Sequence, residues 1–448
     1  MALDTKDNNY LQQNELWQQV RAAIKGKYAI IDIVNTLPGP QYKSYSNLGG
    51  MSAEALRHAN SANFQNSRRV NAYWSRGRFF NATARTADSL DGMIWANDPI
   101  IDLPKSIDYM TTNADGIGGG IREVAQLISD DLVSVGRYGV LVDMPASNGR
   151  LTQAQQENQQ FAPKLITYKP EQIIYTRQGN GLEEVRLLET KEVKKNDFDY
   201  EEKQFIRRLV IIDGVYVNQL FNDKKELIEE HTPVINGQHS KEILFQFFGA
   251  DNNTASFSKI PLLDLASMNL GHFVLDCDNR DNLHFHGQGM TNVFTEMSAD
   301  EFDDANPNGL DTGAKGVNLF QTNDKVELLQ LSATGAIAEE MTRDEKRMIY
   351  LGAQLVQDST ASQTLGAKQM EVNASMSTLK RISKNISAGL EQCLKWAAAF
   401  LGDNKADPKY SLNTEFVTDK MDAQTLALHF QTVQSGLMPK SEYWDVAI

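Results

Sequence analysis

The chain has 448 residues, of which 41% are apolar and 23% charged, as expected of a folded protein with room for about three domains. Its net charge of -14 argues against broad wrapping of nucleic acid, because binding along phosphates requires lysine and arginine. Two cysteines, Cys277 and Cys393, exclude a disulfide framework and a four-cysteine zinc site. The N-terminus lacks the pattern of a secretory signal and no apolar run reaches the length of a membrane span, so no membrane partner is expected.

The first predicted elements along the chain are mostly helical. Apolar residues at helical spacing predict a surface helix over residues 10–26. Residues 28–40 end in Pro-Gly-Pro and are interpreted as an extended segment. A second helical stretch is expected over residues 52–91, bent or broken at Gly77. The sequence RFFNATARTADSLDGMIW, at residues 78–95, is interpreted as protein core, with one helical face formed by Phe79, Thr83, Thr86 and Leu90.

Residues 116–145 predict one compact unit of a helix followed by a strand. The glycine cluster GIGGG, at residues 116–120, precedes an apolar helical pattern that ends at Gly136, and GVLVDMP then predicts a buried strand. Glycines before a helix can bind phosphate through backbone amides, but no strand precedes this cluster and no Lys-Ser or Lys-Thr pair follows it. The cluster is therefore interpreted as the turn that starts the helix.

Residues 165–248 predict an antiparallel meander of strands. The segments are rich in branched and aromatic residues, and turn sequences such as Asp213-Gly214 separate several of them. Five basic residues lie on this meander, and several adjoin acidic ones, so they are interpreted as solvent-exposed strand edges rather than a DNA-binding track: Lys191, Lys194, Lys195, Arg207 and Arg208.

The chain becomes helical again from Lys259. A helix to about residue 282 is followed by an acidic, loop-rich insert at residues 287–324 and by a second helix at residues 333–356. The polar stretch QDSTASQ, at residues 357–363, separates this helix from an apolar stripe at spacings of three and four over residues 364–401. The stripe predicts one helix of about 57 Å, which is too long for a small domain and suits a bundle or an oligomeric ring.

Two segments have residue types that could bind metal, but neither has a convincing pattern. Residues 304–309, DANPNG, begin like a calcium-binding loop, yet Lys315 stands where a bidentate glutamate is needed. Residues 276–287 are interpreted as a polar helix end, since two histidines two residues apart point apart on a helix. No Gly-x-Ser-x-Gly motif occurs, and no cysteine has a plausible histidine partner. We therefore expect no catalytic residue, no bound metal and no cofactor.

Several segments form a recognisable series along the chain. The N-terminal ones are LPGP (residues 37–40), RFFNATARTADSLDGMIW (78–95), DGIGGG (115–120) and VGRYGVLVDMP (135–145). The later ones are PLLDLASMNLGHF (261–273), LHFHG (283–287), YLGAQLVQDSTASQTLGAKQMEV (350–372) and LNTEFVTDKMDAQTLALHFQTVQSGLMPKSEYW (412–444). In this order they resemble tailed-bacteriophage portal proteins, in particular a portal-like family of unknown function. None is a catalytic signature, so the strength of the resemblance lies in their number and order.

The resemblance implies an α+β portal fold in a ring oligomer, with a mixed wing, a two-helix stem, a small clip and a long helix leading to an α-helical crown. The implied boundaries are the wing at residues 1–255, the first stem helix at 256–286, the clip at 287–325, the second stem helix at 326–356, the tunnel-loop region at 357–372, and the long helix with the crown-side part at 373–448.

The resemblance also implies a function without enzymatic activity. Portal proteins form a ring of about twelve subunits at one capsid vertex, through which DNA is packaged and later ejected, and they connect head and tail. The expected partners are further copies of the chain, double-stranded DNA in the channel, the terminase large subunit, a head–tail adaptor, and the major capsid and scaffolding proteins. The expected location is the virion, after assembly in the host cytoplasm.

Two sets of site residues follow from the resemblance. The tunnel loop facing DNA would consist of Gln357, Asp358, Ser359, Thr360, Ala361, Ser362 and Gln363. These residues offer hydroxyls and amides but no base and no aromatic ring, which suits a surface past which DNA slides. The clip residues expected to contact terminase or adaptor are Asp300, Glu301, Asp303, Asp304 and Asp311.

Two other interpretations stay open. Another virion structural protein, such as a head–tail adaptor or minor capsid protein, would form a different ring or none. A metal- or nucleotide-dependent hydrolase is a remote alternative, which would use Asp276, Asp278, His284 and His286, or the glycine turn at residues 116–120.

Overall fold

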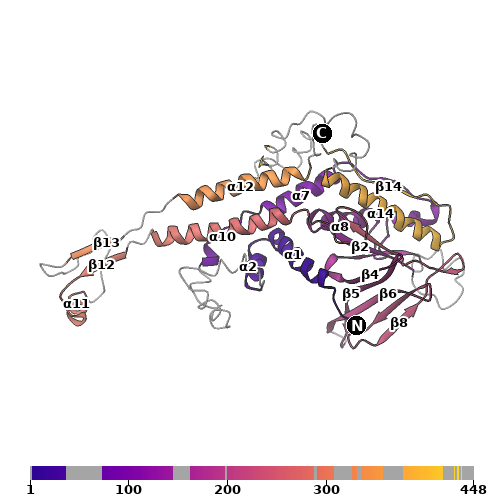
Figure 1. The fold of residues 1–448 in the computed structure, drawn as a ribbon, viewed down its shortest axis with the longest axis horizontal. Helices are drawn as coiled ribbons and strands as arrows, with labels where there is room; N and C mark the ends of the chain where they lie inside the picture. Colours follow the sequence, from indigo (N-terminus) through magenta and orange to yellow (C-terminus); the bar gives the residue numbers. More distant parts are fainter. Residues whose placement is uncertain are drawn as a thin grey trace. The chain divides into compact units, whose positions relative to one another are not determined.

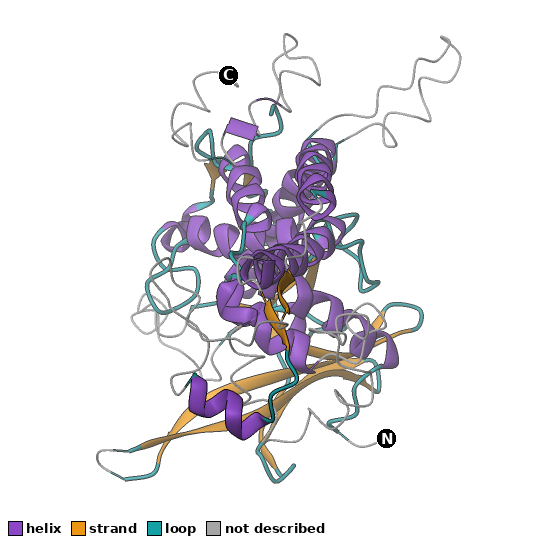
Figure 2. Cartoon of the chain, turned by 90° about the vertical axis from the view of Figure 1, so that its left-hand side faces the viewer, coloured by secondary structure: helices purple, strands orange, loops and turns teal. Residues whose placement is uncertain are grey.

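The structure is a computed structural model. It describes residues 3–36, 73–144, 162–196, 199–286, 290–306, 325–329, 335–356 and 377–416, together with Leu428, Gln431, Thr432 and Ser435. Figure 1 labels the helices and strands along the chain. The chain divides into two compact units. The first comprises Met1–Tyr42, Phe80–Gly271 and Asp344–Ile448, and the second comprises Lys43–Phe79 and His272–Arg343. Helices and strands both contribute to the fold, as Figure 2 shows by colour.

The N-terminal part of the first unit consists of α1 (Asn8–Lys25) and α2 (Lys27–Thr36), which meet at Gly26 with a φ of 97°. The helix expected at residues 10–26 is confirmed. The extended segment expected from residue 28 is wrong as far as residue 36, because this apolar run continues as a helix that buries Ile30 completely. A short apolar run carries no period that separates a buried strand from a buried helix. The rest of the expected segment, residues 37–40, lies outside the described part of the chain.

Helix α7 (Ala82–Ile94) follows a short helical turn at residues 73–76 and a coil at residues 77–81. Its N-cap is Asn81, whose side-chain oxygen accepts from the Ala84 backbone at 2.9 Å, while its amide donates to the Ile24 carbonyl at 2.9 Å. Thr83, Thr86 and Leu90 are buried, which confirms that this segment is core. Phe79 of the predicted face precedes the helix.

A three-stranded antiparallel sheet forms the centre of the first unit. Its order is β11 (Phe245–Gly249), β2 (Arg137–Asp143) and β3 (Lys164–Tyr168). Helix α8 (Ile121–Ser134) leads into β2 through Gly136, which has a φ of 76°, so the predicted helix and strand are confirmed. Two short 3-10 helices, η2 (Lys105–Thr111) and η4 (Pro170–Gln172), connect neighbouring elements.

The predicted meander is confirmed as a five-stranded antiparallel sheet. Its strands lie in chain order: β4 (Ile173–Gln178), β5 (Leu182–Lys194), β6 (Tyr200–Ile212), β7 (Val215–Phe221) and β8 (Leu227–His231). Asp213 and Gly214 both have positive φ between β6 and β7, as a two-residue hairpin turn requires. A small hairpin, β9 (Val234–Ile235) with β10 (Gln238–His239), follows the sheet.

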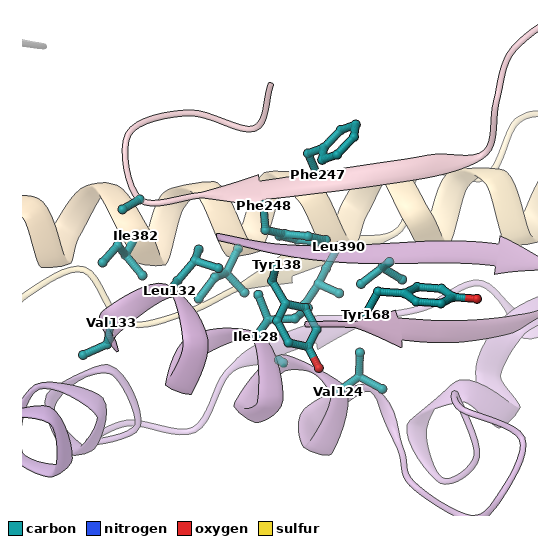
Figure 3. Close-up of a cluster of buried hydrophobic side chains, with 14 of the residues drawn as sticks. Val124, Ile128, Leu132, Val133, Tyr138, Tyr168, Phe247, Phe248, Ile382 and Leu390 are labelled. Carbon is teal, nitrogen blue, oxygen red and sulfur yellow. The ribbon is translucent and has the colours of Figure 1, made fainter. Parts of the chain in front are cut away.

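Helix α14 (Thr378–Phe400) completes the core of the first unit. Its apolar face packs on β11, β2 and α8, and Figure 3 shows Ile382 and Leu390 near Phe248 and the α8 side chains. Gly389 allows this close packing, because a Cβ there would lie 2.3 Å from Cε1 of Phe248. After the helix, β14 (Lys409–Ser411) pairs antiparallel with β1 (Ile100–Asp102).

The prediction of one continuous helix over residues 364–401 is wrong at Ser377. This residue has extended dihedral angles, φ -58° and ψ 151°, and its hydroxyl caps the helix by accepting from the Lys380 backbone at 3.2 Å. A serine hydroxyl that satisfies a free backbone amide favours a helix start at this position. The described helix therefore begins at Thr378, and residues 364–376 lie outside the description.

Helix α10 (Leu263–His286) begins in the first unit and ends in the second. In the second unit, β12 (Met290–Phe294) pairs antiparallel with β13 (Lys325–Leu329), and α11 (Ala299–Ala305) lies between them in sequence. Helix α12 (Ala336–Gln354) follows and ends in the first unit. The insert expected to be loop-rich thus has a hairpin and a short helix. Among the described helices, none is both long and apolar enough to cross a membrane.

Candidate functional site

The polar segment between α12 and α14 is anchored at both ends in the first unit. The backbone amide of Leu379 donates to the carbonyl of Leu355 at 3.2 Å. The end of α12 is fixed by packing, because Met348, Ala353 and Val356 are buried. The described residues on either side of this segment, Val356 and Ser377, therefore lie close together.

The expected tunnel-loop residues all fall within this anchored segment. Gln357, Asp358, Ser359, Thr360, Ala361, Ser362 and Gln363 lie outside the described residues, as does the whole stretch 357–376. What the structure contributes is the geometry of the two ends. Because a backbone hydrogen bond joins the residues that flank this segment, its two ends are close together and the segment does not have to span a long distance.

The insert of the second unit is a β-hairpin that carries acidic residues. Met290 lies opposite Leu329 and Phe294 opposite Lys325, so five residue pairs hold the hairpin in register. Ser298 and Glu301 form a capping box at the start of α11, in which the Ser298 backbone donates to Oε2 of Glu301 at 2.9 Å. This local geometry sets the direction of the short helix.

The acidic residues predicted for the clip separate into two groups. Glu301 is used within the capping box, and hydrogen bonds from the backbone and hydroxyl of Ser298 lower the pKa of its carboxyl. Asp300, Asp303 and Asp304 are exposed, and none has an ion-pair partner among the described residues. Their spacing of three and four residues places them on one face of α11. Asp311 lies outside the described residues.

The carboxylates considered for a hydrolase hold a neighbouring segment against α10 instead. The Tyr73 hydroxyl donates to Oδ1 of Asp278 at 2.8 Å, and the Arg78 backbone donates to Oδ2 of Asp276 at 2.6 Å. Burial raises the pKa of Asp278, and burial together with this carboxylate raises the pKa of Tyr73. Arg280 also pairs with Asp276, at 2.8 Å.

The segment at residues 73–79 packs closely against α10. A Cβ on Gly77 would lie 2.3 Å from Sγ of Cys277, so the backbone passes directly over the helix. Trp74 stacks on Phe273 with ring centroids 5.9 Å apart. His284 is exposed at the helix end, and the side chain of His286 is not described. Within the described part of the chain, no three His, Cys, Asp or Glu side chains converge as a metal site.

Backbone amides of the glycine cluster before α8 donate to the side chains of Asp115 and Asn113, which directly precede the cluster. Oδ1 of Asp115 accepts from the backbones of Ile117 at 2.8 Å and Gly119 at 2.9 Å, and Asn113 accepts from Gly118 at 3.0 Å. Backbone amides that would bind a phosphate are thus already paired. The interpretation as a helix-starting turn agrees with this geometry.

The large sheet contains buried ion pairs that the sequence did not reveal. The expectation of a solvent-exposed edge is wrong for Arg207, which is 7% exposed and pairs with Glu189. Arg208 is half-buried and pairs with Glu184 at 2.7 Å. Burial alone would raise the pKa of Glu189, but hydrogen bonds and charge from Arg207 outweigh it and lower the pKa. The cause is strand register, since β5 and β6 bring opposite charges together from residues 18 positions apart.

Comparisons with known proteins add the following. Residues 261–401 match a family described as a domain of unknown function, DUF4055. This stretch contains α10, the insert, α12 and α14, and the match agrees with the resemblance to a family of unknown function. A search of curated proteins gives no match.

Solved structures with distant similarity include the following two. The neck of the native GTA particle, with C12 symmetry, has a TM-score of 0.41 and 11% identity over 85% of this chain and 93% of that chain. An HK97-family phage portal protein from Corynebacterium diphtheriae has a TM-score of 0.34 and 10% identity over 76% of this chain and 94% of that chain. Both TM-scores are too low to establish a shared fold.

Proposed function

We propose that the chain is the subunit of a bacteriophage portal, a ring-shaped conduit through which DNA is packaged and ejected and which connects head and tail. The observation that carries the proposal is the order of elements from α10 to α14. A helix, a hairpin insert, a second helix, a polar loop with joined ends and a third helix follow one another. This is the order that the sequence resemblance implies for a stem, a clip, a tunnel loop and a helix toward the crown.

The lengths of the helices suit the stem of such a conduit. Helix α10 has 24 residues and α12 has 19, which correspond to about 36 Å and 28 Å of helix. Helices of this length, repeated around a ring, can line a channel for duplex DNA. The polar segment at residues 357–363 would face that DNA without a base or an aromatic ring to bind it tightly.

The insert suits contact with another protein rather than with DNA. Asp300, Asp303 and Asp304 present negative charge on one face of α11, which would repel phosphate. We assign this surface to the terminase large subunit during packaging and to the head–tail adaptor afterwards. The major capsid and scaffolding proteins would contact the wing.

The test is the mass and symmetry of the purified assembly, measured by native mass spectrometry and single-particle class averages. The expected result is a closed ring of about twelve subunits with a central hole wide enough for duplex DNA. A small oligomer without a channel would favour a head–tail adaptor or minor capsid protein. A monomer that holds a stoichiometric metal or nucleotide would contradict the proposal and support a hydrolase.

A further inference from the structure

The five-stranded sheet carries a cluster of charged residues on one face. Leu187 on β5 and Leu209 on β6 are completely buried on the opposite face. Because successive residues of a strand point to opposite faces, their neighbours Arg186 and Arg208 lie on the face with the cluster, directly opposite each other. Glu184 lies there too, and its carboxylate accepts from Nε of Arg186 at 2.8 Å and from Nε of Arg208 at 2.7 Å. We call these three residues the charged face.

The charged face has an excess of positive charge. Burial alone would raise the pKa of Glu184, but hydrogen bonds from Arg208 and Arg186 outweigh it and lower the pKa. The carboxylate is therefore ionised at neutral pH and neutralises one of the two guanidinium groups. The next carboxylate along this face, on Glu230, is bonded to Gln219 at 2.7 Å. A surface with unbalanced arginine favours a partner that carries a carboxylate.

Residues 3–7 lie against the charged face, and we call them the strap. The Leu3 carbonyl accepts from Nη1 of Arg186 at 3.2 Å. Asp4 pairs at 2.8 Å with Nζ of Lys225, which lies in the turn between β7 and β8. The strap has neither helical nor strand structure, so these side-chain contacts rather than a backbone ladder hold it there.

The strap is firmly held at one end and weakly at the other. The Asp7 backbone donates to the Ile174 carbonyl on β4 at 3.3 Å, and its side chain caps α1, whose first turn contains the buried Tyr10. The ion pair between Asp4 and Lys225, by contrast, has both side chains about half exposed, at 52% and 49%. Exposed ion pairs stabilise little and are screened by salt. Few contacts therefore oppose the local opening of residues 3–6.

We propose that the charged face and Lys225 form a docking surface for a peptide segment of another protein that carries aspartate or glutamate, and that the strap occupies this surface in cis. The strap shows the chemistry of the ligand, because it supplies a carboxylate to Lys225 and a carbonyl to Arg186. The inference concerns a surface outside the proposed channel and does not rest on the conduit function.

A partner has a physical advantage over the strap at Arg186. This side chain is 6% exposed and loses one acceptor when the Leu3 carbonyl leaves, which is costly for a buried donor. A carboxylate binds a guanidinium more strongly than a neutral carbonyl does, because the hydrogen bond is charge-assisted. A partner that places a carboxylate there therefore replaces the strap, whereas a neutral peptide gains nothing over it.

The experiment measures how fast phenylglyoxal, a reagent for guanidinium groups, modifies Arg186 in the full chain, with mass spectrometry as the readout. Wild type is compared with Asp4→Lys, which places like charges at Lys225, and with Asp4→Lys/Lys225→Asp, which restores the ion pair in reverse. Two other arginines are internal references: Arg177 is exposed on β4, and Arg207 is buried on the opposite face of the sheet.

Arg186 is expected to react about two- to fivefold faster in Asp4→Lys, the range that the loss of one exposed ion pair gives. The charge-swapped variant returns to the wild-type rate, and Arg177 and Arg207 keep their rates throughout. An acetylated peptide with the sequence of residues 3–9, LDTKDNN, added at millimolar concentration slows the reaction of Arg186 in Asp4→Lys. The matched peptide LNTKNNN, which lacks both carboxylates, does not slow it.

Three outcomes would overturn the inference. An unchanged rate at Arg186 in Asp4→Lys would mean that the strap does not cover the charged face. An equal rise at Arg207 would mean that the sheet itself opens and that the strap is part of its structure. Equal protection by LDTKDNN and LNTKNNN would mean that the surface does not select a carboxylate. None of these outcomes depends on whether the chain forms a ring.

Discussion

A single glycine decides how closely α14 approaches the central sheet. A Cβ at position 389 would lie 2.3 Å from Cε1 of Phe248, a side chain that is completely buried and has no room to move. Gly389→Ala is expected to destabilise the chain by about 1–3 kcal/mol through overpacking, reduced by up to about 1 kcal/mol of improved helix propensity. The measurement is the thermal midpoint of unfolding.

The matched control for this substitution is Gly352→Ala, also inside a helix. There the new Cβ would lie 3.3 Å from Cγ2 of Thr86, a contact that a small shift relieves. We expect its stability to stay within about 1 kcal/mol of wild type, because helix propensity and the tight contact oppose each other. Equal effects of the two substitutions would show that propensity, and not packing against Phe248, governs position 389.

At the scale of the element, a buried polar network joins the large sheet to the central one. Arg207 on β6 pairs with Glu189 on β5, the Tyr168 hydroxyl on β3 donates to Glu189 at 2.7 Å, and Arg207 also donates to Asn218 on β7 at 3.0 Å. Since these groups are buried or nearly so, removing the Glu189 carboxylate leaves Arg207 without its ion pair and the Tyr168 hydroxyl without its acceptor. The network therefore makes sheet stability depend on the charge of Glu189.

The charge of Glu189 gives this network a defined pH dependence. Its pKa in the folded chain is below the ordinary value of 4.5, so its stabilising effect is complete above pH 4.5 and is lost as pH falls through the lowered pKa. Glu189→Gln is expected to cost about 3–5 kcal/mol near neutral pH, because Arg207 stays buried without a counter-charge. The difference in thermal midpoint between wild type and variant should shrink steadily below pH 4.5.

Glu192→Gln is the control on the same strand, since Glu192 is exposed and has no ion pair with a described residue. Its thermal midpoint should follow the wild type at every pH. A gap between wild type and Glu189→Gln that stays constant through the acid range would mean that shape, and not charge, explains the destabilisation.

The elements that could be predicted are those with a local signal. Helix α8 followed by β2 and the meander were predictable because apolar spacing and Asp213-Gly214 report directly on backbone geometry. Residues 28–36 were not, because a short, mostly apolar segment of this kind fits a strand as well as a helix. The start of α14 at Ser377 was also missed, since the apolar stripe continues at helical spacing across the cap.

Strand pairings between segments far apart in the chain could not be predicted from a single sequence. The pairing of β1 with β14 joins residues about 300 positions apart, and the partner of Arg207 depends on the register of two strands. The same limit applies to the site. The polarity of residues 357–363 was readable, whereas the Leu379–Leu355 hydrogen bond that closes the loop required the folded chain.

At the scale of the whole molecule, the joined ends of residues 357–376 allow the proposed roles in assembly and in DNA passage to be tested separately. Because Leu355 and Leu379 are hydrogen-bonded, residues 357–376 can be replaced by a Gly-Ser linker of about six residues without spanning a long gap. Loop-closure entropy changes slowly with length, so the free energy of unfolding should change by about 1 kcal/mol or less. The ring should form as in the wild type.

The same replacement is expected to abolish or strongly reduce packaging, measured as nuclease-protected DNA per assembled particle, because it removes the residues that we propose to face the DNA. The control keeps the loop length and exchanges only Asp358 for Asn, which removes the single charge of residues 357–363 and should preserve packaging. Normal packaging by the shortened chain would refute the tunnel-loop assignment. Failure to form the ring would mean instead that residues 357–376 hold neighbouring copies together, so that the loop acts in assembly before it meets DNA.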